Sequence, residues 1–171
     1  MRTILYMATT VNGFIARENY DSNWTSSEDL KKFSEISKEC GNVIFGRATY
    51  EILKNEGNFP LPDRLNIVLT TNPELLSEKS NVIISNKKPR DILKLLENRG
   101  MDTAFLAGGS KINASFIKEN LIDEIYITIE PLVFGHGIPL FSPAQFEKNL
   151  KLIETILISK NEIQLHYKII K

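Results

Sequence analysis

The sequence has few of the residues that form disulfides or bind metal ions. Among its 171 residues are one cysteine, Cys40, and two histidines, His136 and His166. A single cysteine excludes an internal disulfide and fits a reducing compartment, so we expect a cytoplasmic protein. The two histidines lie far apart in the sequence and match no zinc-ligand spacing, so no metal site is predicted.

The sequence also lacks net charge and long apolar runs. Lysine plus arginine and aspartate plus glutamate each number 21, a balance that argues against a nucleic-acid or anionic-membrane surface as the main function. No apolar stretch is long enough to cross a bilayer, and residues 2–4 indicate a strand rather than a signal peptide. We therefore expect a small-molecule ligand, with neither nucleic acid nor membrane as a partner.

What is present is an alternation of β-favouring segments with segments of helical spacing. Strands are predicted at residues 3–9, 42–45, 65–70, 81–84, 103–106, 124–130, 151–159 and 163–170, and helices from about residue 25, from about residue 47, at 89–96 and at 111–120. Alternation over the first three quarters predicts an α/β fold with a mostly parallel sheet covered on both faces. The last two strands form an antiparallel hairpin, and the length suits one domain, residues 1–171.

The glycine pair Gly108-Gly109 lies between the strand at 103–106 and the helix at 111–120. Unpaired backbone N–H groups and the positive end of the helix dipole meet at such a helix start and attract phosphate. Two glycines also let the backbone approach a ligand closely. The alternative is a plain turn. The phosphate hypothesis gains support from a second junction of the same kind.

That second junction is Gly46-Arg47-Ala48-Thr49, which also joins a strand to a helix. Arginine offers a fixed fork of donors that matches phosphate oxygens, and Thr49 adds a hydroxyl in the first helical turn. Two such junctions in one sheet indicate a ligand with several phosphates, hence a dinucleotide. Thr70 and Thr71, at the end of another strand, suit an extra phosphate or form a polar turn before a proline.

Asp29 is the candidate for chemistry. It lies four residues before Phe33 and therefore on the same helical face, beside an apolar stripe predicted to include Leu30 and Ile36. Burial among apolar residues can tune the protonation of a carboxylate. The alternative is an ordinary acid in the first turn of a helix, where it interacts with the dipole.

Together these segments resemble dihydrofolate reductase and its relative, the pyrimidine reductase of riboflavin synthesis, over nearly the whole chain. The segments that carry the resemblance are residues 11–16, Trp24 with Asp29, Leu30 and Phe33, and residues 46–51, 59–64, 67–71, 126–128 and 130–141. The last of them is more similar to the riboflavin-pathway enzymes. The resemblance implies a three-layer αβα fold of the dihydrofolate reductase type and a cis peptide bond between Gly108 and Gly109.

The resemblance also implies an NADPH-dependent reductase that transfers a hydride to a C=N bond of a pterin. The implied cofactor contacts are Ala8, Ile15, Gly46, Arg47, Ala48, Thr49, Thr70, Thr71, Ala107, Gly108, Gly109, Ser110, Lys111 and Ile112. The implied catalytic residues are Asp29 and Thr128, with Asp29 binding the aminopyrimidine edge of the substrate. The implied substrate contacts are Phe33, Arg64 and Asn113, with Arg64 holding the folate tail carboxylate.

Several alternatives remain open. The acceptor can instead be the phosphoribosylamino-pyrimidine of riboflavin synthesis, whose phosphate would need donors such as Lys111 or His136, although His136 is by default a polar loop residue. The Asp-Asp-Pro substrate segment of those enzymes is absent after the second helix. A nucleotide-binding module without turnover is an alternative of another class, and an α/β domain whose glycine junctions are only turns is a third. The riboflavin-side relatives also imply a homodimer.

Overall fold

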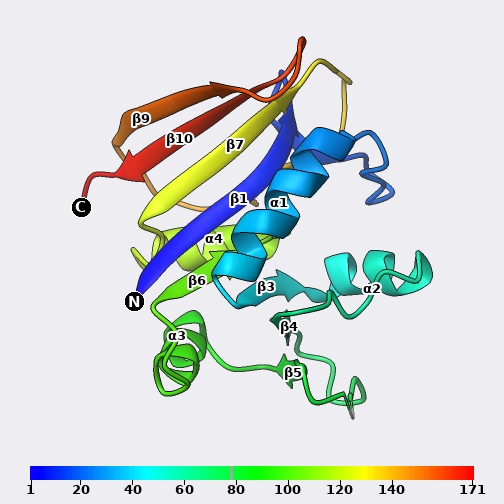
Figure 1. The fold of residues 1–171 in the computed structure, drawn as a ribbon, viewed down its shortest axis with the longest axis vertical. Coiled ribbons are helices and arrows are strands. Elements are labelled where there is room, and N and C mark those ends of the chain that lie inside the picture. Colours follow the sequence, from blue (N-terminus) through cyan, green and yellow to red (C-terminus); the bar gives the residue numbers. More distant parts are fainter. Residues whose placement is uncertain (78) are drawn as a thin grey trace.

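The chain is built around an eight-stranded sheet with the strand order β5-β4-β3-β6-β1-β7-β10-β9 (Figure 1). A computed structural model describes residues 1–77 and 79–171. The strands of this sheet are β1 (Arg2–Thr10), β3 (Asn42–Gly46), β4 (Leu65–Leu69), β5 (Val82–Ser85), β6 (Thr103–Leu106), β7 (Glu124–Glu130), β9 (Leu150–Leu157) and β10 (Ile163–Ile169). The strands from β5 to β7 run parallel, and β10 is antiparallel to both β7 and β9. The predicted mostly parallel sheet with a closing hairpin is confirmed.

Helices cover both faces of the sheet. They are α1 (Ser27–Glu39), α2 (Arg47–Asn55), α3 (Pro89–Glu97) and α4 (Ser110–Lys118). On one face Phe33 of α1 and Leu53 of α2 pack against an apolar cluster that includes Phe45. On the other face Ile92 of α3 and Phe116 of α4 belong to a second cluster within the sheet. The predicted three-layer αβα arrangement is therefore confirmed, with a core on each side of the sheet.

Local sequence explains where the helices begin and end. The Ser26 side chain accepts a hydrogen bond from the Asp29 backbone N–H at 3.1 Å and so caps α1. Pro89 occupies the first turn of α3, where its missing N–H costs no helical hydrogen bond. In residues 1–77 and 79–171, every helix is too short or too polar to cross a membrane.

The segment of residues 131–146, which follows β7, contains a short strand. β8 (Ile138–Pro139) pairs antiparallel with β2 (Phe14–Ala16), which follows the first strand and its turn. Gly137 permits this pairing, because a Cβ at that position would lie 2.6 Å from the Ala16 carbonyl oxygen. Two residues of β8 are too few for a sequence pattern to show, so this pairing could not be predicted from local sequence.

The expected apolar stripe of α1 is wrong at one position. Leu30 is 54% exposed, whereas the neighbouring Asp29 is only 2% exposed. The helix is rotated so that Phe33 and Ile36 face the sheet and Asp29 points inward with them. Leu30 then lies on the wall of an open cleft, and its exposure is a property of that cleft.

Candidate functional site

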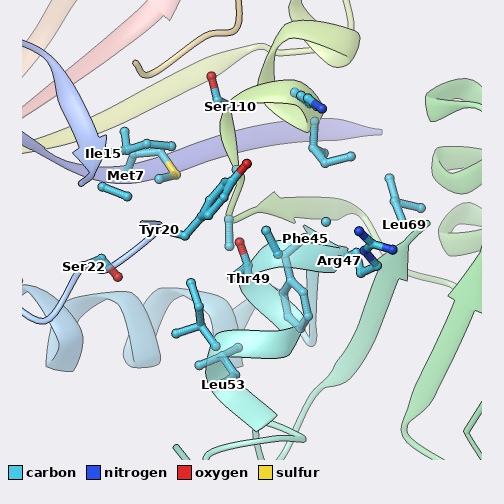
Figure 2. Close-up of a pocket in the computed structure, with 18 of the residues that line it drawn as sticks. Met7, Ile15, Tyr20, Ser22, Phe45, Arg47, Thr49, Leu53, Leu69 and Ser110 are labelled. Atoms are coloured by element: carbon cyan, nitrogen blue, oxygen red, sulfur yellow. The ribbon is translucent and has the colours of Figure 1, made fainter. Parts of the chain in front are cut away.

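A cleft of about 1200 Å³ runs along the carboxyl ends of the parallel strands (Figure 2). Ligands of open α/β sheets bind at this edge. Of the expected cofactor contacts, all except Gly108 line the cleft, and so do Asp29, Phe33 and Arg64. Gly108 is buried directly behind the wall. The structure therefore brings together residues that the sequence spreads from Ala8 to Ile112.

The two glycine junctions lie side by side at this edge. The Gly46 N–H donates to the Gly108 carbonyl at 2.9 Å, and the Ala107 N–H donates to the Ile44 carbonyl at 2.8 Å. Gly46 precedes α2 and Gly109 precedes α4, and in the described part of the chain neither helix start receives a side-chain cap. The first-turn donors of both helices are thus available to one anionic ligand.

Small residues are required where the two junctions meet. A Cβ on Gly46 would lie 2.9 Å from Cγ1 of Ile112, and one on Gly108, whose φ is +87°, would lie 2.9 Å from Sδ of Met7. The peptide bond between Gly108 and Gly109 is cis, as expected. Figure 2 shows Arg47, Thr49 and Ser110 around this part of the cleft. The local chemistry is cationic and rich in hydroxyl groups.

The far end of the cleft contains donors that the sequence reasoning missed. Thr70 and Thr71 lie there as expected, and they are joined by Ser85 and Lys87 from the end of β5. The Thr70 N–H donates to the Ser85 carbonyl at 2.9 Å, which fixes the two strand ends against each other. The parallel pairing of β4 with β5 was the available signal, because it places the residues after both strands at one edge.

Asp29 lies at the other end of the cleft, within a buried hydrogen-bond network. The Tyr6 hydroxyl donates to Asp29 Oδ1 at 2.7 Å, and the Gln164 amide donates to the Tyr6 hydroxyl at 2.9 Å. The same amide donates to the Thr128 hydroxyl at 3.0 Å. Asp29 and Thr128 were expected to interact, whereas Tyr6 and Gln164 were missed because their strands are remote in sequence.

Opposing effects act on the protonation of Asp29. Burial raises the pKa of Asp29, hydrogen bonds from Thr128 and Tyr6 lower it, and the negative charge of Glu162 raises it. Tyr6 itself stays protonated, because burial and the Asp29 charge both raise its pKa. The Tyr6 hydroxyl makes the direct hydrogen bond to the Asp29 carboxyl with good geometry, and the Thr128 hydroxyl lies beside that of Tyr6. Asp29 is therefore a buried carboxyl whose environment tunes its proton affinity.

Two further carboxyl groups lie next to this network. The antiparallel register of β10 on β7 sets Ile163 opposite Ile129 and so brings Glu162 opposite Glu130. Glu130 is 2% exposed and Glu162 is 8% exposed. The Ser26 N–H donates to Glu130 Oε1 at 2.9 Å. Burial raises the pKa of Glu130, the Ser26 N–H lowers it, and Glu162 raises it further by repulsion.

Two of the expected substrate contacts, Asn113 and Arg64, have side chains that are hydrogen-bonded within the protein. Asn113 is fully buried behind the cleft wall, and its side-chain amide donates to the Leu140 carbonyl at 2.8 Å. The expected substrate contact for Asn113 does not fit this geometry, because the side chain anchors the segment after β8. Arg64 does line the cleft, but it is 5% exposed and donates to Ser34, Ser37 and Pro62.

The remaining candidates divide between the cleft and the outer surface. Phe33 and Lys111 line the cleft, and His136 is an exposed loop residue. Tyr20, which the sequence reasoning did not select, projects its ring into the cleft (Figure 2). Its φ of 68° is unusual for a bulky residue and indicates a loop held by its surroundings. Arg17 provides that support through Asp21, with Nη1 and Oδ2 2.7 Å apart.

The fold and the cleft define the class of the protein. An αβα domain of this topology, with paired helix starts and a buried acid on the first helix, is a reductase domain of the dihydrofolate reductase type. The chain belongs to the family described as the RibD C-terminal domain, whose model matches residues 2–163. The resemblance predicted from the sequence is confirmed.

Individual relatives agree with this assignment. The chain is 33% identical over 170 residues to the uncharacterized protein YwjB of Bacillus subtilis strain 168, with 97% of each chain covered. The crystal structure of a putative riboflavin biosynthesis protein from Shewanella sp. PV-4 superimposes with a TM-score of 0.84 at 24% identity, over 100% of both chains. Dihydrofolate reductase from Enterococcus faecalis, complexed with NADP(H), gives a TM-score of 0.73 at 24% identity, over 98% of this chain and 96% of that one. Both structural likenesses show the fold.

The buried pair Glu130 and Glu162 predicts an unusual dependence of stability on pH. Because the pKa of Glu130 is raised above 4.5 in the folded state, the folded chain holds more protons than the unfolded chain as pH rises from that value. Stability should then fall with rising pH through this window. Glu130→Gln, whose amide oxygen can still accept from Ser26, should raise the unfolding temperature at about pH 8 by about 2–4 °C, the shift that ~1 kcal/mol gives at this size.

Thermal unfolding of both proteins between about pH 4 and pH 8 measures this effect. The gain should vanish near the acid end, where the native carboxyl is protonated. Glu154→Gln, on the exposed strand β9, is the matched control and should leave the curve unchanged. A Glu130→Gln curve parallel to that of the unmodified chain would contradict the raised pKa of Glu130.

Proposed function

We propose that this chain is an NADPH-dependent reductase that reduces a C=N bond of a pterin-like ring. One observation carries the proposal: two helix starts without side-chain caps and a buried carboxyl line the same cleft. The helix starts suit a diphosphate, and the carboxyl suits the aminopyrimidine edge of a pterin. A dihydrofolate reductase of the same fold whose structure is complexed with NADP(H) supports the choice of cofactor.

The residues present fit NADPH along the length of the cleft. First-turn N–H groups after Gly46 and Gly109 would hold the diphosphate, with the Arg47 guanidinium beside them. Thr70, Thr71 and Lys87 would hold a phosphate on the adenosine side. Ala8 and Ile15 would contact the nicotinamide. NADPH, when bound, supplies the hydride for such a reduction.

Asp29 would bind and orient the acceptor. A carboxyl at the amino-substituted edge of the ring accepts hydrogen bonds from the ring and favours protonation at the reacting nitrogen. Burial excludes water around Asp29 and keeps its proton affinity high. The side chain of Phe33, on the same face of α1, would pack against the ring.

The state of Arg64 favours a second candidate acceptor. Its guanidinium makes four hydrogen bonds, to Pro62, to Ser37 and twice to Ser34, so within the described chain one of its N–H donors remains. A bidentate hold on a folate tail carboxylate needs two. This geometry favours an acceptor without that tail, such as the riboflavin-pathway aminopyrimidine, whose phosphate would bind Lys111. A module that binds NADPH without turnover is the alternative of another class.

Arg47 offers a test of cofactor binding. Arg47→Ala should weaken NADPH binding about tenfold, since a charge-assisted hydrogen bond is worth ~1.5 kcal/mol or more. Arg90→Ala is the matched control, because Arg90 of α3 pairs with Glu119 at the end of α4 and is not among the residues that line the cleft. Titration of NADPH fluorescence measures both affinities. Equal affinities in the two variants would remove Arg47 from the cofactor site.

The reaction is tested with the two candidate acceptors and with the variant Asp29→Asn. NADPH oxidation should be seen with dihydrofolate or with the phosphoribosylamino-pyrimidine, and Asp29→Asn should lower kcat at least tenfold because the acceptor loses its carboxyl. NADPH affinity should stay nearly unchanged. Glu28→Gln, an exposed neighbour on the same helix turn, is the control. Tight NADPH binding without turnover of either acceptor would favour the non-catalytic module, and equal turnover in Asp29→Asn would remove Asp29 from the mechanism.

We also propose that two copies of the chain pair through β9. This strand is one of the two edge strands of the sheet, and its exposed aliphatic side chains include Leu150, Leu152 and Leu157. An edge strand offers unpaired backbone groups, and pairing with its own copy about a two-fold axis satisfies them in a closed assembly. Leu152, which is 51% exposed, lies within this surface.

Leu152→Glu should shift the chain from dimer to monomer in light scattering, because it places a charge within the apolar surface of β9. Leu76→Glu, at an 81% exposed position elsewhere, is the matched control and should leave the mass unchanged. A monomeric unmodified chain at high concentration would overturn the proposal.

A further inference from the structure

The hydrogen bonds behind Asp29 have a direction that one side chain sets. Gln164 Nε2 carries two hydrogens, and they go to the Tyr6 hydroxyl at 2.9 Å and the Thr128 hydroxyl at 3.0 Å. A hydroxyl oxygen that accepts a hydrogen bond still has its own proton to donate. The Tyr6 proton goes to Asp29 Oδ1, 2.7 Å away. The amide therefore turns the donors of both neighbours away from itself.

This arrangement fixes where a proton on Asp29 can lie. Because Oδ1 accepts the Tyr6 proton, a proton that Asp29 gains is placed on Oδ2. Tyr6 is 2% exposed and Gln164 and Thr128 are fully buried, so bulk water does not compete for these hydrogen bonds. The network thus separates an inner oxygen, which is held by the protein, from an outer oxygen left for a ligand.

The orientation of Gln164 is maintained at a cost. Among the residues that the structure describes, Gln164 Oε1 is buried and has no hydrogen-bond partner. Leaving a buried acceptor unpaired is unfavourable. The opposite amide orientation would pair Oε1 with both hydroxyl protons, but it would take the Tyr6 proton away from Asp29. The two orientations make opposite predictions for Asp29, which allows them to be distinguished.

We propose that Tyr6 and Gln164 are positioning residues for Asp29, with Gln164 setting the direction of the hydroxyl protons and Tyr6 holding Oδ1, so that Oδ2 meets the acceptor. The value of this device for catalysis rests on the proposed reductase function, in which Asp29 binds the reducible ring. Its existence in the folded chain is independent of that function. Neither residue contacts the reacting atoms in this proposal.

The charged groups around Asp29 come from several elements. Glu162, just before β10, acts on Asp29 by repulsion, and Glu130 at the end of β7 lies opposite Glu162. Tyr6 approaches from β1, and Thr128 from β7. Glu162 raises the proton affinity of Asp29, while the hydroxyl donors Thr128 and Tyr6 lower it. Removing one donor should therefore shift the titration of Asp29 toward higher pH.

The test is a ¹³C NMR titration of the Asp29 carboxyl in the full chain without added ligand, assigned by loss of the signal in Asp29→Asn. Tyr6→Phe should raise the pKa of Asp29 by about one unit. Tyr126→Phe is the matched control, because Tyr126 stacks on Tyr6 with ring centroids 6.3 Å apart and lies on the neighbouring strand. It should leave the Asp29 titration unmoved, and an equal shift in both variants would overturn the proposal.

Gln164→Leu tests the direction itself. If the Gln164 amide nitrogen donates to the two hydroxyl groups, its loss leaves their protons free to turn away from Asp29. The pKa of Asp29 should then rise. With the opposite orientation, loss of the amide oxygen would release both protons to Asp29, and the pKa would fall. A fall in Gln164→Leu, or no change in Tyr6→Phe, overturns the proposal. A thermal unfolding curve for each variant reports any loss of folding separately.

Kinetics then separate this proposal from the proposed function. If the chain is a reductase, the pH profile of kcat/KM in Tyr6→Phe should move toward higher pH by the same shift as the carboxyl signal, with KM for NADPH unchanged. A shifted carboxyl signal without turnover of either acceptor would sustain the positioning roles and overturn the reductase. Turnover of an acceptor with an unmoved carboxyl signal would sustain the reductase and overturn the positioning roles.

Discussion

The structure depends on the parallel pairing of β3 with β6. Because β3 and β6 are parallel neighbours, the helices that follow them, α2 and α4, begin next to each other at the same edge of the sheet. The hydrogen bond from the Gly46 N–H to the Gly108 carbonyl locks these two exits together. Every later feature of the cleft takes its position from this contact. A side chain at Gly46 would press on the start of α4, because its Cβ would lie 2.9 Å from Cγ1 of Ile112.

A second connection ties the cleft to the antiparallel hairpin. Ser26 caps α1 through its side chain, which accepts from Asp29, while its own N–H donates to Glu130 on β7. One residue thus sets both the start of the helix that carries Asp29 and its distance from the acid pair. Asp29 meets the hydroxyl of Tyr6 because the helix begins at that point. The hairpin of β9 and β10 then supplies Gln164, which completes the surroundings of Asp29.

The sequence predicted the elements well because each has a local signal. Residues 103–106 and 124–130 were predicted with the bounds of β6 and β7, since each is rich in β-favouring residues and lies between polar turns. The glycine junctions were found because a glycine before a helix is visible in the sequence. The exposure of Leu30 was not predicted, because Leu30 faces a cleft that only the fold creates, whereas Asp29 is buried on the helical face that it was expected to share with Phe33.

The network behind Asp29 shows the other limit of sequence reasoning. Tyr6 and Gln164 are 158 positions apart, and they meet only because β1, β7 and β10 are consecutive strands of the sheet. The facing of Glu162 and Glu130 depends on antiparallel register, which a shift of one residue would reverse. Without a homologous structure, neither pairing has a local signature. A glutamine within a β pattern is the sequence signal for such a contact, because a buried glutamine in a strand needs hydrogen-bond partners.

The two ends of the cleft differ in electrical character, and this difference orders a ligand along it. Helix starts, Arg47 and Lys87 make the end at β3, β4 and β6 positive. Asp29, with Glu162 and Glu130 behind it, makes the end at α1 negative or proton-rich. A ligand with an anionic bridge at one end and a ring rich in N–H donors at the other is stabilised in one orientation and repelled in the reverse. Charge would thus orient such a ligand before close contact forms, and the hydrogen bonds around Asp29 would then hold its ring.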